Sequence, residues 1–244
     1  EAGHQQQPQH LVGRALEPGQ GHADEQAADT VDEQGAALTL LAVQSAERGP
    51  DRTRIVALTD DGRLLMTTLS SRMNMLTRQA TVTADTTRLP MIPAMPVRLL
   101  LDKTLGNLFV IDARGTIHYY DVSDAANPRI VQSVSAGAVI TAAEFLVGSV
   151  SLIVGTEDGE LSQWFLVRGA DNESQLTRIR EFRSHGAAIT AIAPEYTRKG
   201  FLVGDAAGQL GIHYGTSSRT LYLDDFSDGP LQHLAISQLN GRIL

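Results

Sequence analysis

The stretch that decides the fold runs from Ser151 to Trp164: Ser-Leu-Ile-Val-Gly-Thr-Glu-Asp-Gly-Glu-Leu-Ser-Gln-Trp. An apolar run leads into an acidic turn, and an alternating run then ends on the single Trp of the chain. Gly159 closes the turn, and because it has no Cβ it can adopt the positive φ that a tight hairpin turn requires. The stretch therefore predicts two short antiparallel strands joined by a tight turn.

The same pattern recurs elsewhere in the chain. Further apolar runs and acidic or polar turns are centred on Gly62, Gly115 and Gly208. Consecutive turn glycines lie 53, 44 and 49 residues apart. A nearly constant spacing of this size is typical of a repeat architecture in which each repeat is one supersecondary unit.

Each hairpin also has extended runs beside it. Runs that precede a hairpin or begin a new unit lie at 97–101, 139–145, 189–194 and 231–237, and runs that follow one lie at 129–134, 176–182 and 220–223. Four strands at a period of roughly 40–50 residues are typical of propeller blades. We therefore predict an all-β fold over residues 35–244, an incomplete β-propeller of WD-like four-stranded blades. The expected blades are 36–90, 95–135, 138–184, 186–226 and a truncated fifth at 229–244.

Residues 1–34 differ from the rest in composition. They are rich in Gln, Gly and acidic residues, which predicts a tail or linker with one short strand at 11–16. Residues 1–35 carry a net charge of −6 out of the −8 of the whole chain. The remainder is close to neutral, which argues against a nucleic-acid partner.

Composition excludes several kinds of site. The chain has no Cys, which excludes disulfides, thiolate metal ligands and a Cys nucleophile. It has no apolar run of the length that a membrane-spanning helix needs, so no span is expected in this chain. The acidic turns lack the spacing of a calcium loop, and we interpret them as turn-forming residues. No metal and no cofactor is expected.

Two histidines invite a catalytic interpretation. His118 and His213, each followed by Tyr, are expected at the same blade position, the end of the third strand. A repeated position favours packing over catalysis, and His185 is expected to cap the loop between two blades by hydrogen bonding. The first strands of the units, expected to line a central channel, are nearly bare of acid and base groups. The sequence therefore predicts no catalytic residue and a protein that is not an enzyme.

One concentration of basic residues stands out. We interpret these residues as a solvated rim, with contact to an anion or a partner as the alternative. Arg178 and Arg180 are expected to share one face of their strand, which an anion site could use. The set consists of Arg178, Arg180, Arg183, Arg198 and Lys199.

A family resemblance follows from these units. The run from His185 through Ala193, a His-Gly pair followed by a strand, resembles the opening of a WD-type repeat. Gly204 to Leu210 resembles the middle hairpin of such a repeat. Trp164 lies where these repeats often place Trp, although Phe165 follows it instead of Asp, and we interpret it as a residue that packs between blades.

A narrower resemblance covers 185–194, 199–210 and 215–221. These segments resemble the periplasmic insert of long-form phosphate ABC-transporter permeases. The resemblance implies a non-catalytic interaction or sensor domain at the periplasmic face of the bacterial inner membrane. The full-length protein would be membrane-embedded and would import phosphate, with other transporter subunits or the substrate-binding protein as partners. Two alternatives stay open: a propeller hydrolase or lyase, and a free-standing WD-type scaffold. Self-association through an open propeller edge is also expected.

Overall fold

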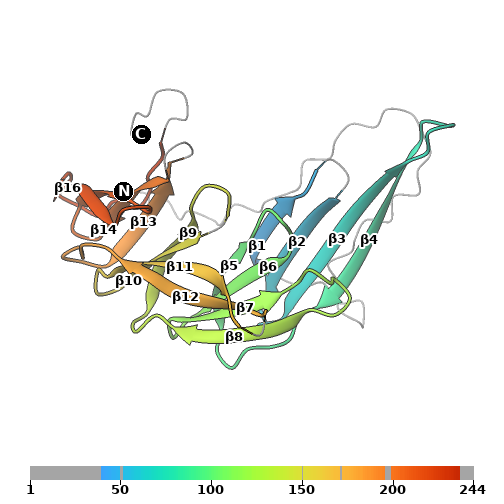
Figure 1. The fold of residues 1–244 in the computed structure, drawn as a ribbon, viewed down its shortest axis with the longest axis horizontal. Coiled ribbons are helices and arrows are strands. Elements are labelled where there is room, and N and C mark those ends of the chain that lie inside the picture. The colour runs from blue at the N-terminus through green and yellow to red at the C-terminus, as the bar shows by residue number, and fades with distance from the viewer. Residues whose placement is uncertain (1–39, 50–51, 150, 171, 196–198, 237–244) are drawn as a thin grey trace, which may run out of the picture.

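The computed structural model describes residues 40–49, 52–149, 151–170, 172–195 and 199–236. Over these residues the chain forms four separate four-stranded antiparallel sheets and no helix, so the all-β prediction is confirmed. The four sheets follow one another in chain order along a curved row (Figure 1). None of the described sheets closes on itself. The predicted strand at 11–16 lies outside the described residues.

The strands of the first two sheets are as follows. The first sheet contains β1 (Leu40–Glu47), β2 (Arg52–Thr59), β3 (Leu64–Met73) and β4 (Ala80–Arg88). The second contains β5 (Pro96–Leu101), β6 (Asn107–Asp112), β7 (Thr116–Asp121) and β8 (Arg129–Ser135).

The strands of the third and fourth sheets follow the same plan. The third sheet contains β9 (Ile140–Phe145), β10 (Ser151–Thr156), β11 (Leu161–Arg168) and β12 (Ser174–Glu181). The fourth contains β13 (Ile189–Pro194), β14 (Gly200–Asp205), β15 (Gln209–Tyr214) and β16 (Arg219–Asp225). In all four sheets, strands pair in sequence order. The run at 231–237, predicted as the first strand of a fifth unit, forms no strand over 231–235.

Apolar clusters join each sheet to the next. Such stacking lets a sheet bury both of its faces, which one sheet cannot do alone. Trp164 packs in the cluster between the second and third sheets, the packing role that its sequence position predicts. Representative buried residues of the three junctions, in chain order, are Val56 with Tyr120, Phe109 with Trp164, and Ile153 with Phe201.

The turn glycines adopt the predicted conformation. Gly62, Gly115, Gly159 and Gly208 have φ values of 81°, 79°, 85° and 91°. At Gly115 the requirement is also steric, because a Cβ there would lie 2.0 Å from the carbonyl oxygen of Ala138 in the chain that leads to the next sheet. The middle hairpin of each sheet therefore needs glycine for its own turn, and at Gly115 also for the passage of the chain to the next sheet.

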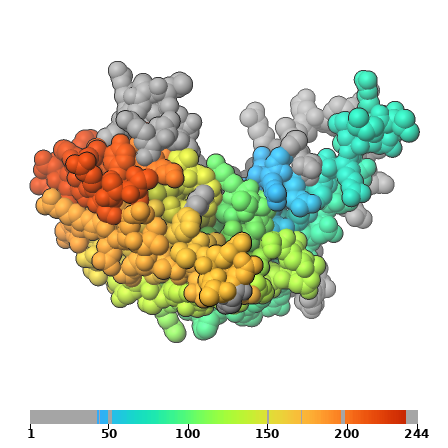
Figure 2. All heavy atoms as spheres, in the orientation of Figure 1, coloured from blue at the N-terminus to red at the C-terminus, as the bar shows by residue number. Residues whose placement is uncertain are grey.

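The β3–β4 hairpin is longer than its counterparts. With strands of ten and nine residues, it extends beyond the rest of the described chain (Figures 1 and 2). Most of β4 is exposed. The sheet repeat therefore carries one projecting arm, at the end of the row opposite to the fourth sheet (Figure 1).

Candidate functional site

The second sheet buries an acid and an imidazole side by side. Asp112 ends β6, and its Oδ1 accepts hydrogen bonds from the backbone N–H groups of Arg114 and Thr116, both at 2.9 Å. Its Oδ2 lies 3.1 Å from Nε2 of His118 on β7. Burial works to raise the pKa of Asp112, but the hydrogen bonds from Thr116, His118 and Arg114 outweigh it and hold this pKa below its usual value. The carboxylate therefore stays ionised and organises the turn.

The fourth sheet has a matching acid. Asp205 ends β14, and its Oδ1 accepts from the N–H groups of Ala207 and Gln209, both at 2.9 Å. Its Oδ2 lies 3.2 Å from Nδ1 of His185, which comes from the loop before β13. The N–H of His185 also donates to the carbonyl of Gly159 in the third sheet. His185 thus links two sheets by hydrogen bonding, as its sequence context predicts.

A second imidazole continues this chain of contacts. Nε2 of His213 lies 3.4 Å from Nε2 of His185, and Nδ1 of His213 lies 3.1 Å from Oγ1 of Thr220. A consistent set of donors exists with both imidazoles neutral. In it, Nδ1–H of His185 donates to Asp205, Nε2–H of His213 donates to Nε2 of His185, and the hydroxyl of Thr220 donates to Nδ1 of His213. Burial, together with the neighbouring His185, lowers the pKa of His213 to about 3. Burial also lowers the pKa of His185, against the opposing effect of Asp205.

His118 and His213 are not equivalent, contrary to the sequence prediction. His118 lies six residues after Asp112, whereas His213 lies eight residues after Asp205. The counterpart of His118 is Gly211, where a Cβ would lie 2.5 Å from Nε2 of His213. Gly211 therefore makes room for the histidine pair of the fourth sheet. In the second sheet, by contrast, the imidazole comes from the strand itself.

A hydroxyl completes the chain of contacts in the second sheet. Nδ1 of His118 lies 2.8 Å from Oγ of the exposed Ser133 on β8, which gives an Asp-His-Ser series. Sequence spacing could not reveal it, because β7–β8 pairing brings Ser133 to His118, which lies across the β6–β7 turn from Asp112. In the catalytic triad of serine proteases the acid holds Nδ1 and the serine contacts Nε2, and here the two nitrogens are exchanged. The fourth sheet has a comparable series that contains two imidazoles and ends at the hydroxyl of Thr220, and this recurrence favours a role in holding strands together.

The predicted basic set does not converge. Arg178 lies over the ring of Trp164 at 5.0 Å and donates to the carbonyl of Ala136, whereas Arg180 donates to Oε1 of Gln163 at 3.3 Å. The pairing of β11 with β12 shifts register between Gln163 and Trp164, so one residue of β12 is left over. This bulge places Arg178 and Arg180 on opposite faces of the sheet. The expectation that they share a face is wrong.

The rest of the basic set is dispersed. Arg183 and Lys199 are exposed, in the segment after β12 and just before β14. Arg198 lies outside the described residues. Since the two arginines of β12 serve packing and hydrogen bonding within the sheets, this set does not form one anion site over the described residues.

The first strands of the second and third sheets, β5 and β9, each carry one charged side chain. Arg98 of β5 donates to the carbonyl of Ala143 on β9 at 3.0 Å. Next to that carbonyl lies Glu144, and burial raises the pKa of its carboxyl against the opposing effects of the Phe145 N–H and of Arg98. The sequence predicts that these strands carry almost no acid or base groups. That prediction overlooked Glu144, although Glu144 belongs to the predicted strand run at 139–145.

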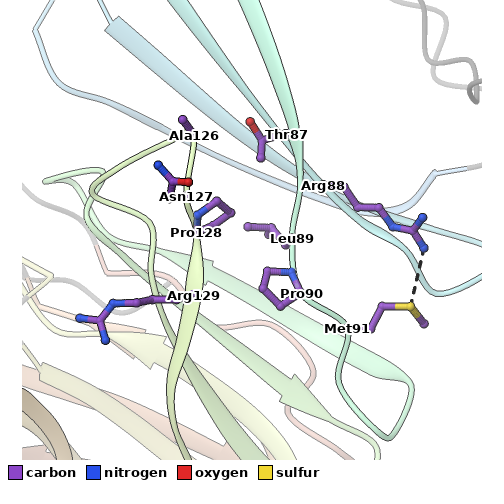
Figure 3. Close-up of a pocket in the computed structure, with 9 residues that line it drawn as sticks. All are labelled: Thr87, Arg88, Leu89, Pro90, Met91, Ala126, Asn127, Pro128 and Arg129. Atoms are coloured by element: carbon purple, nitrogen blue, oxygen red, sulfur yellow. Dashed lines mark hydrogen bonds between the residues drawn. The ribbon is translucent and has the colours of Figure 1, made fainter.

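An open groove lies between the first and second sheets (Figure 3). It encloses about 720 Å³ between the segment that ends β4 and the loop that precedes β8. The buried Leu89 and its neighbour Pro90 lie along one side of it, and Pro128 lies along the other (Figure 3). The lining residues are Thr87, Arg88, Leu89, Pro90, Met91, Ala126, Asn127, Pro128 and Arg129.

The groove combines rigid apolar sides with charge at its margins. Proline fixes φ, which stiffens the two facing segments. Arg88 lies beside Met91, 3.6 Å from its sulfur, and Arg129 pairs with Asp121 at 3.3 Å. The hydroxyl of Tyr120 donates to the carbonyl of Pro90 and so anchors one wall to the second sheet. Such a surface suits a peptide segment or a protein edge better than a reaction, since none of its lining side chains is an acid or an imidazole.

Comparisons with known proteins add no assignment. No protein-family model matches the chain, and no curated protein matches it. Over the described residues, no helix has the length and apolarity to cross a membrane. Within the same residues, no group of three or more His, Asp or Glu side chains is arranged to hold a metal ion.

Proposed function

We propose that the chain is a non-catalytic interaction domain, and that it belongs to a phosphate-type ABC-transporter permease at the periplasmic face of the inner membrane. The transporter context is supported by the sequence resemblance at 185–221. In the structure, support comes from the Asp205–His185 contact, which ties the His-Gly segment to the middle hairpin that follows it. The partners on this proposal are other transporter subunits or the substrate-binding protein.

The observation that carries the proposal is a contrast in exposure. His118, His185 and His213 are buried and committed to hydrogen bonds that hold turns and strands. The groove beside Pro90 and Pro128, by contrast, is open and offers apolar sides with arginines at its margins (Figure 3). A surface of this kind suits binding, whereas the imidazoles of His118, His185 and His213 are withdrawn from solvent.

The test is binding of the purified chain to the periplasmic phosphate-binding protein and to the membrane subunits of the same transporter. The double variant Arg88→Glu/Arg129→Glu is expected to weaken binding at least about tenfold, because it reverses both charges at the groove margins. Arg183→Glu, an exposed arginine away from the groove, is the matched control. Binding that is absent for both partners would remove the transporter assignment. If both variants bind as well as wild type, the interface lies outside the groove.

The propeller architecture is part of the proposal. Each sheet places its first strand at one edge, and the first strands lie next to each other, β1 beside β5 and β9 beside β13. These neighbouring first strands support the proposal, because blades of a propeller place their first strands around a central axis. A crystal structure of the purified chain is expected to show the four sheets arranged as blades around one axis. The same open row is expected to self-associate, which sedimentation velocity over a range of concentrations would detect.

A hydrolase is the second candidate, on one observation. Asp112, His118 and the exposed Ser133 are joined by contacts of 3.1 and 2.8 Å, and Ser133 faces solvent. A serine-directed fluorophosphonate distinguishes the two functions. The interaction-domain proposal expects no labelling of Ser133 above that of Ser135 on the same strand. Selective labelling, lost in Ser133→Ala and in His118→Ala, would favour the hydrolase.

A further inference from the structure

The β3–β4 hairpin ends in an apolar tip that nothing in the described chain covers. Met75 and Leu76 are 85% and 96% exposed, and Met73 beside them is 65% exposed. Leu76 and Met75 are the most exposed of the large apolar side chains over the described residues. Exposed apolar groups at the end of a projecting hairpin mark an interaction site, because edges without partners normally carry charges there.

The tip is nevertheless an ordered turn. Oδ1 of Asn74 accepts hydrogen bonds from the N–H groups of Leu76 and Thr77, at 2.9 and 3.3 Å. The N–H of Arg78 donates to the carbonyl of Asn74, and the N–H of Asn74 donates to the carbonyl of Gln79, both at 2.8 Å. The backbone of the tip is thus largely paired within the turn, so its apolar side chains can enter an apolar medium at low cost in unsatisfied polar groups.

The hairpin behind the tip has two unlike faces. Register pairs Met73 with Ala80 and Ser71 with Val82, so these residues share one face, which is mainly apolar. The intervening pairs place Arg72 opposite Thr81 on the other, polar face. Val82 is 64% exposed, so the apolar face continues the apolar tip along the arm.

Charge indicates which partner suits the arm. Between Gly62 and Ala84 the chain has no acidic residue, and Arg72 and Arg78 flank the apolar tip. This segment belongs to a chain with a net charge of −8. An apolar tip with basic residues just behind it is the arrangement of segments that insert into a membrane interface and contact lipid phosphates.

We infer that the β3–β4 hairpin is a membrane anchor: Met73, Met75 and Leu76 insert into the interface of a bilayer that contains anionic phospholipid, while Arg72 and Arg78 contact the phosphate groups. The acidic remainder of the chain is repelled from the same surface, which orients the molecule with the hairpin toward the lipid. The inference rests on the hairpin alone and holds whether or not the transporter assignment does.

The experiment is flotation of the full chain with two kinds of vesicle, phosphatidylcholine alone and phosphatidylcholine with phosphatidylglycerol. Wild type is expected to float with the anionic vesicles and at least about tenfold less with the neutral ones. Met75→Asp/Leu76→Asp is expected to abolish flotation, and Arg72→Gln/Arg78→Gln to abolish the preference for anionic lipid. Leu221→Asp/Phe226→Asp, which changes two residues that are 59% and 60% exposed on the fourth sheet and just after it, is the matched control and is expected to float like wild type.

A direct readout of insertion is available because the chain has no Cys. Met75→Cys, labelled with an environment-sensitive fluorophore, is expected to shift to the blue and brighten on anionic vesicles. Thr177→Cys on the exposed outer strand β12 is expected not to change. Failure of wild type to float with either vesicle would overturn the inference. So would equal flotation of the aspartate variant, or a dimer that this variant dissociates while lipid binding is absent, because the tip would then contact a second copy.

Discussion

At the scale of single residues, the two buried carboxylates Asp112 and Asp205 obtain an imidazole partner from different parts of the chain. Asp112 and Asp205 both accept two backbone N–H groups with one oxygen and face an imidazole with the other. The second sheet supplies the imidazole from β7, and the fourth supplies it from the loop before β13. Since buried carboxylates are costly without partners, either source removes the same penalty.

His213 should make the chain sensitive to acid. Its pKa is about 3 in the folded chain, whereas an unfolded histidine titrates near 6.5. Between these values the unfolded state binds more protons, so the free energy of unfolding falls as the pH decreases through this window and is fully retained above it. His213→Gln is expected to lower stability at neutral pH but to flatten this dependence. Urea midpoints at about pH 7.5 and about pH 5 measure both effects, and an unchanged slope in the variant would contradict the assignment.

At the scale of elements, the middle turn of the second sheet also controls how the third sheet approaches. Gly115→Ala places a Cβ 2.0 Å from the carbonyl oxygen of Ala138 at a φ of 79°. Gly137→Ala has a comparable φ of 102° but meets nothing within 4 Å. The expected losses of unfolding free energy are more than about 3 kcal/mol at Gly115 and about 1–2 kcal/mol at Gly137.

Denaturant titration of both variants separates backbone strain from steric conflict, because Gly137→Ala carries only the strain. Equal losses at the two glycines would show that the contact with Ala138 relaxes without cost.

At the scale of the whole molecule, a buried arginine joins the first sheet to the second. Arg54 of β2 donates to the carbonyls of Leu105 and Val122 and to Oγ1 of Thr68. Burial lowers the pKa of its guanidinium. Its neighbours in sequence gave no sign of this role, because the two carbonyls lie 51 and 68 residues away.

Arg54→Met should weaken the whole row of sheets. Met fills much of the same space but leaves the carbonyls of Leu105 and Val122 without their donor, at an expected cost of about 2 kcal/mol. Because Trp164 lies between the second and third sheets, its fluorescence reports the neighbouring junction. Fluorescence and circular dichroism are expected to shift by the same amount in urea, with Arg183→Met unchanged. A shift confined to circular dichroism would show that the first sheet unfolds separately.

The sequence by itself determined the repeat, because turn glycines and alternating strands are local signals. The spacing of Gly62, Gly115, Gly159 and Gly208 located four hairpins, and each glycine has the positive φ predicted for it. The same local logic identified Trp164 as a packing residue. Pairing between strands that are consecutive in sequence requires little more than these turns.

Only the tertiary structure decided which side chains meet. The bulge in β12 separates Arg178 from Arg180, because a register shift reverses the faces of a strand without any mark in its composition. The contact of His185 with Asp205 and the groove between Pro90 and Pro128 likewise depend on how strands and sheets pack. A period places elements along the chain, whereas contacts between elements depend on register and packing over distances that no local pattern records.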